Sequence, residues 1–423
     1  MYLNGGGVKK VVMLTTDQKL DRRIILEART LCRFEYRVTI LAAPWPEARE
    51  SYDHEPFDLV RIGNGANETS RSRNFASPLT LYRIHHRLKK GGRFVQPYLH
   101  LLRSFFRGYL ADIERLYFRL FFQPAVQAGG AVYHVHDPQP LAAGWYAADK
   151  LMARLIYDSH ELFAEQEFLA AEKRKWRRIE GRYIQRADRV ITINDSIARE
   201  LTRRYGIHPP VVLRNCESRV PWKETAGRDA CGLTRRLGLP GDARLILYQG
   251  GLIPNRNLEN LIRSMTYVRD PRAVLIVIGN GELQGKLLRL VKRCDLGRRA
   301  FLIPGVPQKD LLPFTAQAAL GVIPYTATCL NTFYCTPNKL FEYIAAGVPL
   351  LVSDLPELRK FVKTYNLGWI ADLTTPEKIA AAIDCAISGD EDLRNRRENA
   401  AEAFETLCWE EEEKKLISLY EGL

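Results

Sequence analysis

Residues 336–354 read TPNKLFEYIAAGVPLLVSD, and this stretch decides the fold class. A polar turn opens a helical pattern that carries Lys339 and Glu342 on one side. Gly347 and Pro349 then end the helix and begin a short apolar strand. A helix that runs directly into a buried strand is typical of a parallel sheet covered by helices, so the stretch predicts an α/β fold.

The same alternation of short apolar runs and longer amphipathic stretches appears in both halves of the chain. The expected strands of the first half are Lys10–Thr15, Arg37–Ala42, Ala131–His136, Arg154–Asp158 and Val190–Asn194. Those of the second half are Leu245–Gly250, Ala273–Gly279, Ala300–Pro304, Leu320–Pro324 and Pro349–Ser353. Because a single core seldom grows beyond about 250–300 residues, a chain of 423 residues predicts two doubly wound, Rossmann-like domains.

The domain boundaries follow from these patterns. Residues 1–215 form the expected N-terminal domain, and residues 242–395 form the C-terminal one. Between them, residues 216–241 lack periodicity and collect Pro, Gly and charges, as a linker does. Residues 396–423 are expected to form a helix that packs across the domain join. Ligands bind beyond the carboxyl ends of such strands, so we expect a site in a cleft between the domains.

Composition excludes several classes of protein. Hydrophobic residues make up 46% of the chain and charged residues 26%, and no apolar run approaches the roughly 20 residues that a membrane-spanning helix needs. The N-terminal sequence MYLNGGGVKKVVML contains only a short apolar run, so we expect a cytoplasmic protein. The eight cysteines are scattered, without a C-x-x-C pair, and are expected to be reduced and structural.

Positive charge is concentrated in one segment. The formal net charge is +13, and residues 71–122 contain eleven Lys or Arg against two acidic residues. Apolar residues recur there at helical spacing, at Leu99, Leu102, Phe106, Tyr109, Ile113, Leu116 and Leu120, with arginines alongside at 103, 107, 115 and 119. Two readings stay open: a helix docked on the core with a solvated cationic face, or an interfacial helix on anionic lipid.

Two parts of the C-terminal half suit a phosphate-bearing ligand. Asn338 and Lys339 come at the start of the expected helix, where free N–H groups and the helix dipole favour an anion. Glu342, one turn later, can accept hydrogen bonds from paired hydroxyls such as those of a ribose. Two glycine-rich turns also follow strands, with Gly250 and Gly251 in the first and Gly279 and Gly281 in the second. Glycine lets a ligand approach the backbone, although the second turn alone is simply a tight turn.

Together these motifs resemble the GT-B glycosyltransferases of family four, which are retaining enzymes built from two Rossmann-like domains. The matching segments are VVMLTTDQKLDRR, YHVHDPQPLAAG, YDSHELF, VVLRN, YQGGL followed by Arg256, IGNGEL and residues 336–354. The resemblance covers nearly the whole chain. It implies transfer of a sugar from a nucleotide diphosphate to a lipid-linked or saccharide acceptor, with an N-terminal acceptor domain and a C-terminal nucleotide-sugar domain.

The resemblance also implies roles on the donor side. Glu342 is the acid that binds the ribose, and Arg256 grips the diphosphate. Two departures from the family pattern matter, because Gly251 stands where many members have a second basic residue, and Tyr334 stands where many have a second glutamate. Lys339 is therefore expected to take over part of the phosphate contact, and Tyr334 is placed on the sugar side.

On the N-terminal side, the resemblance places His136 against the donor sugar, with Asp137 beside it. The implied catalytic residues are His136, Asp137, Arg256 and Lys339. The implied acceptor or sugar side consists of Asp17, Asp158, His160, Glu161 and Tyr334. Tight turns also favour Asp and Ser, so a structural role stays open for the residues after the Arg154–Asp158 strand.

We expect transfer without a metal or other cofactor, because Arg256, Lys339 and a helix N-terminus can stabilise the leaving diphosphate. The acidic residues Asp390–Asp392 are expected to lie in a solvated loop. The expected partners are a nucleotide sugar, its acceptor and an anionic membrane surface, with the protein peripheral at the inner face of the cytoplasmic membrane and no nucleic acid bound. Two alternatives share the architecture: a nucleotide-sugar 2-epimerase and an inactive membrane-associated adaptor.

Overall fold

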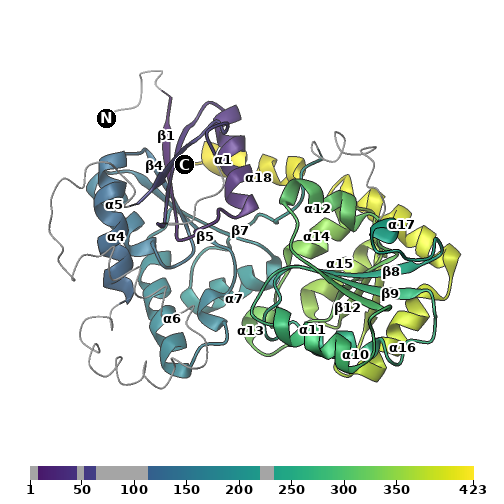
Figure 1. Ribbon diagram of the computed structural model, residues 1–423. Helices are drawn as coiled ribbons and strands as arrows, with labels where there is room; N and C mark the ends of the chain where they lie inside the picture. Colours follow the sequence, from purple (N-terminus) through teal and green to yellow (C-terminus); the bar gives the residue numbers. More distant parts are fainter. Residues whose placement is uncertain (1–7, 45–51, 63–112, 220–232) are drawn as a thin grey trace. The chain divides into compact units, whose positions relative to one another are not determined.

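The computed structural model describes residues 8–44, 52–62, 113–219 and 233–423, which form two compact units (Figure 1). The first unit contains the chain up to Ala164, residues Phe168–Leu213 and the C-terminal residues Lys415–Leu423. The second contains Glu165–Glu167 and Arg214–Lys414. Each unit is a parallel sheet with helices on both faces, so the predicted pair of doubly wound α/β domains is confirmed.

The sheet of the first unit has seven strands in the order β3-β2-β1-β4-β5-β6-β7. Their bounds are β1 Lys10–Thr15, β2 Arg37–Ala42, β3 Asp58–Arg61, β4 Val132–His136, β5 Arg154–Ser159, β6 Arg189–Thr192 and β7 Val211–Val212. The central strands are almost entirely buried, as expected for a parallel sheet that is covered on both faces.

Helices α4, α5 and α6 lie together on one face of this sheet, and α1 lies on the other (Figure 1). The helices of the unit are α1 Arg22–Arg33, α4 Ile113–Ala128, α5 Leu141–Lys150, α6 Ala170–Ile184 and α7 Asp195–Tyr205, with a 3-10 turn at Phe163–Glu165. Asp21 begins α1 by accepting a hydrogen bond from the Arg23 backbone N–H at 2.8 Å. This is the cap expected of an aspartate at that position.

The sheet of the second unit has six strands in the order β10-β9-β8-β11-β12-β13. Their bounds are β8 Arg244–Gln249, β9 Ala273–Ile278, β10 Ala300–Ile303, β11 Leu320–Ile323, β12 Leu350–Ser353 and β13 Gly368–Ala371. The helices are α9 Leu233–Arg236, α10 Leu258–Ser264, α11 Gln284–Arg293, α12 Gln308–Thr315, α13 Leu330–Phe333, α14 Asn338–Ala345, α15 Pro356–Tyr365, α16 Pro376–Ile387, α17 Asp390–Phe404 and α18 Trp409–Glu421. Helix α18 continues into the first unit.

Three strands were not predicted: β3, β7 and β13. All three are outermost in their sheets, and their residues are only partly buried. An edge strand needs no continuous apolar run, so these segments lack the signal that marked the central strands. The apolar stripe expected from Leu99 to Leu120, with its arginines, lies mostly outside the described residues. Within α4, its member Leu120 is buried, while Arg115 and Arg119 are exposed.

Three further expectations are corrected. The single helix expected over residues 396–423 is in fact two helices, α17 and α18. Leu407 and Cys408 are buried between them, and the Trp409 N–H donates to the Glu217 carbonyl instead of to a carbonyl of α17. Residues Asp390–Asp392 form the first turn of α17, where the helix dipole favours acidic side chains. Part of the expected linker belongs to the second unit, whose main segment begins at Arg214 and buries Leu233.

Candidate active site

In the second unit, two cations meet on one aromatic ring. The Lys339 Nζ donates to the Tyr325 hydroxyl and lies 4.7 Å from the centre of that ring, while the Arg256 guanidinium carbon lies 4.3 Å from it. Lys339 Nζ is also 5.0 Å from the centre of the Tyr248 ring. Gly250 leaves room for this approach, because a Cβ there would lie 3.2 Å from Nζ. Contacts of this kind hold the two cations close together.

Nothing neutralises these two charges within the part of the chain that the structure describes. Neither Arg256 nor Lys339 forms an ion pair with a described carboxylate. Burial raises the pKa of the Tyr248 hydroxyl to about 12 and also raises the pKa of Tyr325, so neither phenol becomes an anion near neutral pH. The two cations are therefore available to an anionic ligand.

The N-terminus of α14 adds hydrogen-bond donors to this cation pair. Lys339 is the second residue of the helix, and the residue before the helix, Pro337, provides no side-chain cap. The first backbone N–H groups of a helix have no partner within it and commonly bind phosphate. Asn338 has a different role, since its Oδ1 accepts a hydrogen bond from Asn215 Nδ2 at 2.8 Å.

Glu342 lies one turn along α14 and is held by a chain of polar side chains. It is only 7% exposed, and its Oε2 accepts a hydrogen bond from Gln249 Nε2 at the end of β8. Gln249 Oε1 in turn accepts from the Thr315 hydroxyl at 2.8 Å. This support fixes the carboxylate, and sequence reasoning did not identify Gln249 or Thr315.

The remaining residues predicted for the donor side have mixed surroundings. A Cβ on Gly279 would lie 1.9 Å from the Gly250 carbonyl oxygen, and one on Gly281 would lie 2.3 Å from the Leu252 carbonyl oxygen. The two turns pack so closely that a side chain at either position would clash with the backbone, which explains why both residues are glycine. Gly251 has more space, with its nearest neighbours 3.8 Å away on Ile253. Tyr334, at the end of α13, lies in the second unit with the donor residues.

In the first unit, strand register brings the predicted histidines and aspartates together. His136 on β4 pairs with Asp158 on β5, and His160 follows directly. His136 Nδ1 lies 3.0 Å from His160 Nε2 and 3.5 Å from Asp158 Oδ2. Asp137 has a left-handed backbone, with φ of 63°, and its Oδ1 accepts a hydrogen bond from the His160 backbone N–H at 3.3 Å.

A second group of buried residues, which the sequence did not single out, supports this cluster. Arg23 on α1 bonds Asp158 Oδ1 through Nη2 at 2.5 Å and Glu27 Oε1 through Nε at 2.8 Å. His134 lies two residues before His136 and so shares its face of the strand, and its Nδ1 is 2.9 Å from the Tyr420 hydroxyl. The available signals were the i,i+4 spacing of Arg23 and Glu27 and the H-x-H pattern of β4.

These contacts set the protonation states. Burial opposes the charge on His160, but the carboxylates of Asp137 and Asp158 raise its pKa to about 10. Burial and the neighbouring His134 lower the pKa of His136 well below its usual value. Burial raises the pKa of Asp137 to about 7, whereas Arg23 and His160 outweigh burial and hold the pKa of Asp158 well below its usual range. At neutral pH, a cationic His160 thus lies beside a neutral His136.

Asp17 and Glu161 lie next to this cluster in the chain fold. The Asp17 carboxylate accepts a hydrogen bond from the Asp21 backbone N–H at 3.1 Å, and burial raises its pKa while His160 lowers it. The Glu161 carbonyl accepts from the Ser159 hydroxyl at 2.9 Å, which shapes the turn after β5. The Asp17 carboxylate therefore interacts electrostatically with His160, and the Glu161 backbone stabilises the turn.

One group of side chains has donor atoms suited to a metal ion. Atoms of Glu27, His134, His136 and Asp158 all lie within 4.8 Å of one another and are buried. The guanidinium of Arg23 already bonds both carboxylates of this group and provides a positive charge there. A divalent cation would have to share the carboxylates with that guanidinium.

Two family models match the chain, one in each unit. Residues 21–216 match the model described as Glycosyltransferase Family 4, and residues 233–403 match the model described as glycosyl transferases group 1. Together the two matches span most of the chain. The chain belongs to the glycosyltransferases that these models describe, and the resemblance drawn from its motifs is confirmed.

Individual relatives are distant. A D-inositol 3-phosphate glycosyltransferase of Xylanimonas cellulosilytica is 24% identical over 68% of this chain and 71% of that enzyme. The putative teichuronic acid biosynthesis glycosyltransferase TuaH of Bacillus subtilis is 26% identical over 64% of this chain and 67% of its own length. Matches to other curated relatives cover as little as 59% of their length. The structure of Anabaena HepE in complex with UDP superposes with a TM-score of 0.70 and 14% identity, over 98% of this chain and 100% of that one, which confirms the GT-B fold.

Proposed function

We propose that the chain transfers a sugar from a nucleoside diphosphate to an acceptor hydroxyl. The observation that carries the proposal is the pair Arg256 and Lys339, unneutralised at the uncapped N-terminus of α14, with the fixed carboxylate of Glu342 one turn further on. The cations and helix N–H groups suit a diphosphate, and Glu342 suits the hydroxyls of a ribose. The UDP in the structure of HepE supports a nucleotide ligand.

The proposed reaction proceeds with retention of configuration. The bond between the anomeric carbon and the diphosphate breaks, an oxocarbenium-like centre forms, and the acceptor oxygen attacks from the face that the diphosphate leaves while its proton passes to an oxygen of the departing diphosphate. Arg256, Lys339 and the α14 N–H groups stabilise the charge that develops on the leaving group, so no metal is required. His136 and Asp137 support the reacting sugar, while His160 orients the sugar or the acceptor and is itself positioned by the buried Asp158 carboxylate, 3.4 Å from its Nε2.

The proposed acceptor is a lipid-linked or free saccharide in the synthesis of a surface polysaccharide or glycoconjugate. The name of the Bacillus subtilis relative supports this class of acceptor. We place the protein at the inner face of the cytoplasmic membrane, where such an acceptor is available. No helix in the described ranges is long and apolar enough to cross a membrane. The attachment that we propose is peripheral.

A panel of nucleotide sugars tests the proposal by thermal unfolding. A ligand at about 100 times its dissociation constant stabilises the folded state by about 2.7 kcal/mol, so the donor should raise the melting temperature by several degrees. The free nucleoside diphosphate should reproduce much of the shift, and the free sugar should not. If no uridine, guanosine or thymidine diphosphate sugar shifts the transition, the proposed donor class is wrong.

A further inference from the structure

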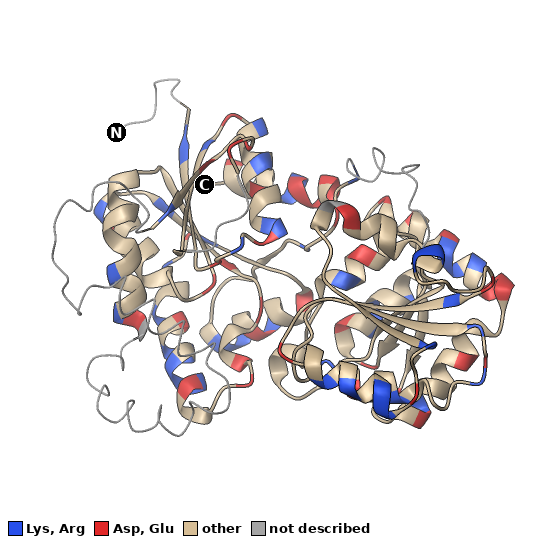
Figure 2. Cartoon of the chain, in the orientation of Figure 1, with Lys and Arg blue, Asp and Glu red and all other residues tan. Residues whose placement is uncertain are grey.

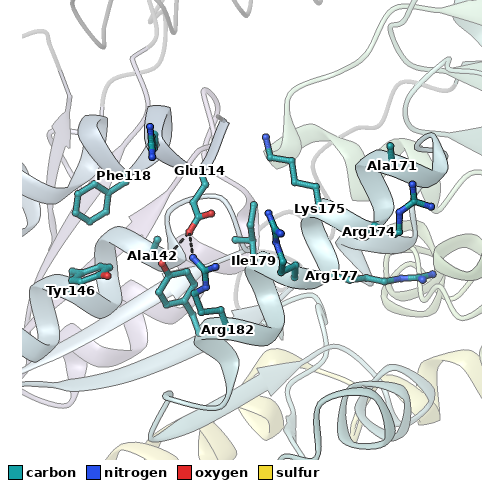
Figure 3. A pocket seen from close by; sticks show the side chains of 13 residues that line it. Glu114, Phe118, Ala142, Tyr146, Ala171, Arg174, Lys175, Arg177, Ile179 and Arg182 are labelled. Carbon is teal, nitrogen blue, oxygen red and sulfur yellow. Dashed lines mark hydrogen bonds and ion pairs between the residues drawn. The ribbon is translucent and has the colours of Figure 1, made fainter. Parts of the chain in front are cut away.

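A wide hollow lies between α4, α5 and α6 of the first unit, and none of the residues assigned to the donor or the sugar lines it. Its volume is about 1150 Å³, and Figure 3 shows the side chains that line it. Six of them are cationic: Arg115, Arg174, Lys175, Arg177, Arg178 and Arg182. Glu114 is the single acidic side chain among the lining residues.

Glu114 does little to balance this charge. Its Oε1 accepts a hydrogen bond from the Tyr183 hydroxyl at 3.0 Å and lies 3.4 Å from Arg182 Nη1, so it is already engaged by these two side chains (Figure 3). Arg174 and Arg178 are exposed and form no ion pair within the described ranges. They are four residues apart on α6 and therefore project from the same side of the helix.

Apolar side chains lie towards both ends of α6: the Tyr146 ring is 6.4 Å from the Tyr183 ring, centre to centre, and Leu169 precedes the helix. The Phe118 ring of α4 meets the Tyr146 ring of α5 edge-on, with 5.3 Å between their centres, and 43% of Tyr146 is exposed. Leu169, the residue before α6, is 79% exposed. Guanidinium groups next to exposed apolar side chains suit a ligand that has a phosphate at one end and a hydrocarbon part at the other.

We propose that this hollow binds the phosphate headgroup of an acidic membrane lipid. The inference rests on the peripheral membrane location proposed above and names the surface that makes the contact. Arg174 and Arg178 contact the phosphate, while Tyr146 and Leu169 enter the headgroup layer. A single-stranded nucleic acid needs a row of exposed aromatic rings on which its bases can stack. Among the described residues that line the hollow, Tyr146 is the one exposed aromatic side chain. The observations therefore favour a lipid.

The test requires a control for general charge, because Lys and Arg are spread over the helices of both units (Figure 2). The chain offers a matched pair: Arg289 and Arg293 on α11 are also exposed, also four residues apart and also without an ion pair in the described ranges. The test variant is Arg174→Gln with Arg178→Gln, and the control is Arg289→Gln with Arg293→Gln. Both doubles remove two positive charges from an exposed helix face.

The measurement is co-sedimentation with vesicles of phosphatidylglycerol or of phosphatidylcholine, at low and at physiological salt. Each cation near an anionic surface contributes about 1 kcal/mol, so the α6 double should bind phosphatidylglycerol about 10- to 30-fold more weakly, and the α11 double should bind like the wild type. Tyr146→Ser with Leu169→Ser should also weaken binding, without changing its salt dependence. Unfolding temperatures establish that the variants are folded.

Several results would overturn the inference. They are equal binding by both arginine doubles, equal binding of the wild type to phosphatidylcholine, and release from vesicles by inorganic phosphate or by single-stranded RNA at concentrations too low to screen charge. Release by phosphate would assign the hollow to a soluble anion, and release by RNA would assign it to nucleic acid. The nucleotide-sugar melting shift is independent of vesicles, so failure here is distinguishable from failure of the proposed transferase.

Discussion

The imidazole rings of His136 and His160 lie 3.0 Å apart, Nδ1 to Nε2, at the carboxyl ends of two neighbouring strands. His160 carries a positive charge at neutral pH, while His136 is neutral. A charged His160 donates its Nε2 hydrogen to His136, which leaves the His136 Nε2 hydrogen for another acceptor. The pair therefore fixes the tautomer of His136, whose Nε2 is buried 3.9 Å from Glu27 Oε2, and its properties can be tested separately from those of the donor site.

His136→Ala should lose transfer while it keeps nucleotide affinity, since the residues proposed for the diphosphate belong to the second unit. We expect the rate of transfer to fall by about 100-fold or more, which is the typical contribution of a positioned acid, base or hydrogen-bond donor. Calorimetric titration with the nucleoside diphosphate provides the affinity, and steady-state kinetics provide the rate. Loss of both, or aggregation of the variant, would make His136 a structural residue.

The charge on His160 should make stability depend on pH in a defined direction. The pKa of His160 rises from 6.5 in the unfolded chain to about 10 in the folded protein. The contribution of His160 to the free energy of unfolding is fully present below pH 6.5 and is lost as the pH rises through the pKa of the folded protein. We therefore expect the wild type to lose stability, on the order of 1–3 kcal/mol, as the pH rises from about 6.5 to about 10.

His160→Gln removes this contribution, so its unfolding free energy should change less over the same pH range. His208→Gln serves as the control, because His208 is exposed. Denaturant unfolding at several pH values measures the difference between the variants. A His160→Gln profile parallel to that of the wild type would show that His160 is not held cationic in the folded protein.

Glu342→Ala should weaken nucleoside diphosphate binding, because hydrogen bonds to a charged acceptor contribute about 1.5–3 kcal/mol. Gln249 donates a hydrogen bond to Glu342 and accepts one from Thr315. Thr315→Val leaves Gln249 less restrained, so it should lower the affinity for the nucleoside diphosphate by less than Glu342→Ala does. Glu391→Ala, an exposed glutamate in the first turn of α17, is the control. Unchanged affinity in Glu342→Ala would remove Glu342 from the site.

The sequence predicted what depends on local pattern. Apolar runs such as Ala273–Ile278 marked the central strands, and the 336–354 segment located α14 with Lys339 and Glu342. The i,i+4 spacing of Arg23 and Glu27 indicates an ion pair but not its burial, because an Arg and a Glu four residues apart on a helix usually form a surface pair. Only the packing of α1 on the sheet, which buries Arg23 against Asp158, reveals their role.

Transfer should be independent of divalent metal ions. Chelation with EDTA is expected to leave the rate unchanged, since the proposed stabilisation of the diphosphate uses Arg256, Lys339 and the helix N-terminus. The melting temperature provides a second readout, because Glu27 Oε2, His134 Nε2, His136 Nε2 and Asp158 Oδ2 are buried without a hydrogen-bond partner in the described ranges. A fall in melting temperature on chelation, restored by Zn²⁺, would show that these atoms hold an ion.

The most direct test of the central claim compares a nucleoside diphosphate with the corresponding monophosphate. Calorimetric titrations are made with the wild type, with Arg256→Met and with Lys339→Met. The wild type should bind the diphosphate more tightly, because the proposed contacts of Arg256 and Lys339 are with the terminal phosphate. Each substitution should weaken diphosphate binding by about 1.5–3 kcal/mol and leave monophosphate binding nearly unchanged. Variants that bind the diphosphate as the wild type does, or that lose both ligands equally, would contradict a diphosphate site at the start of α14.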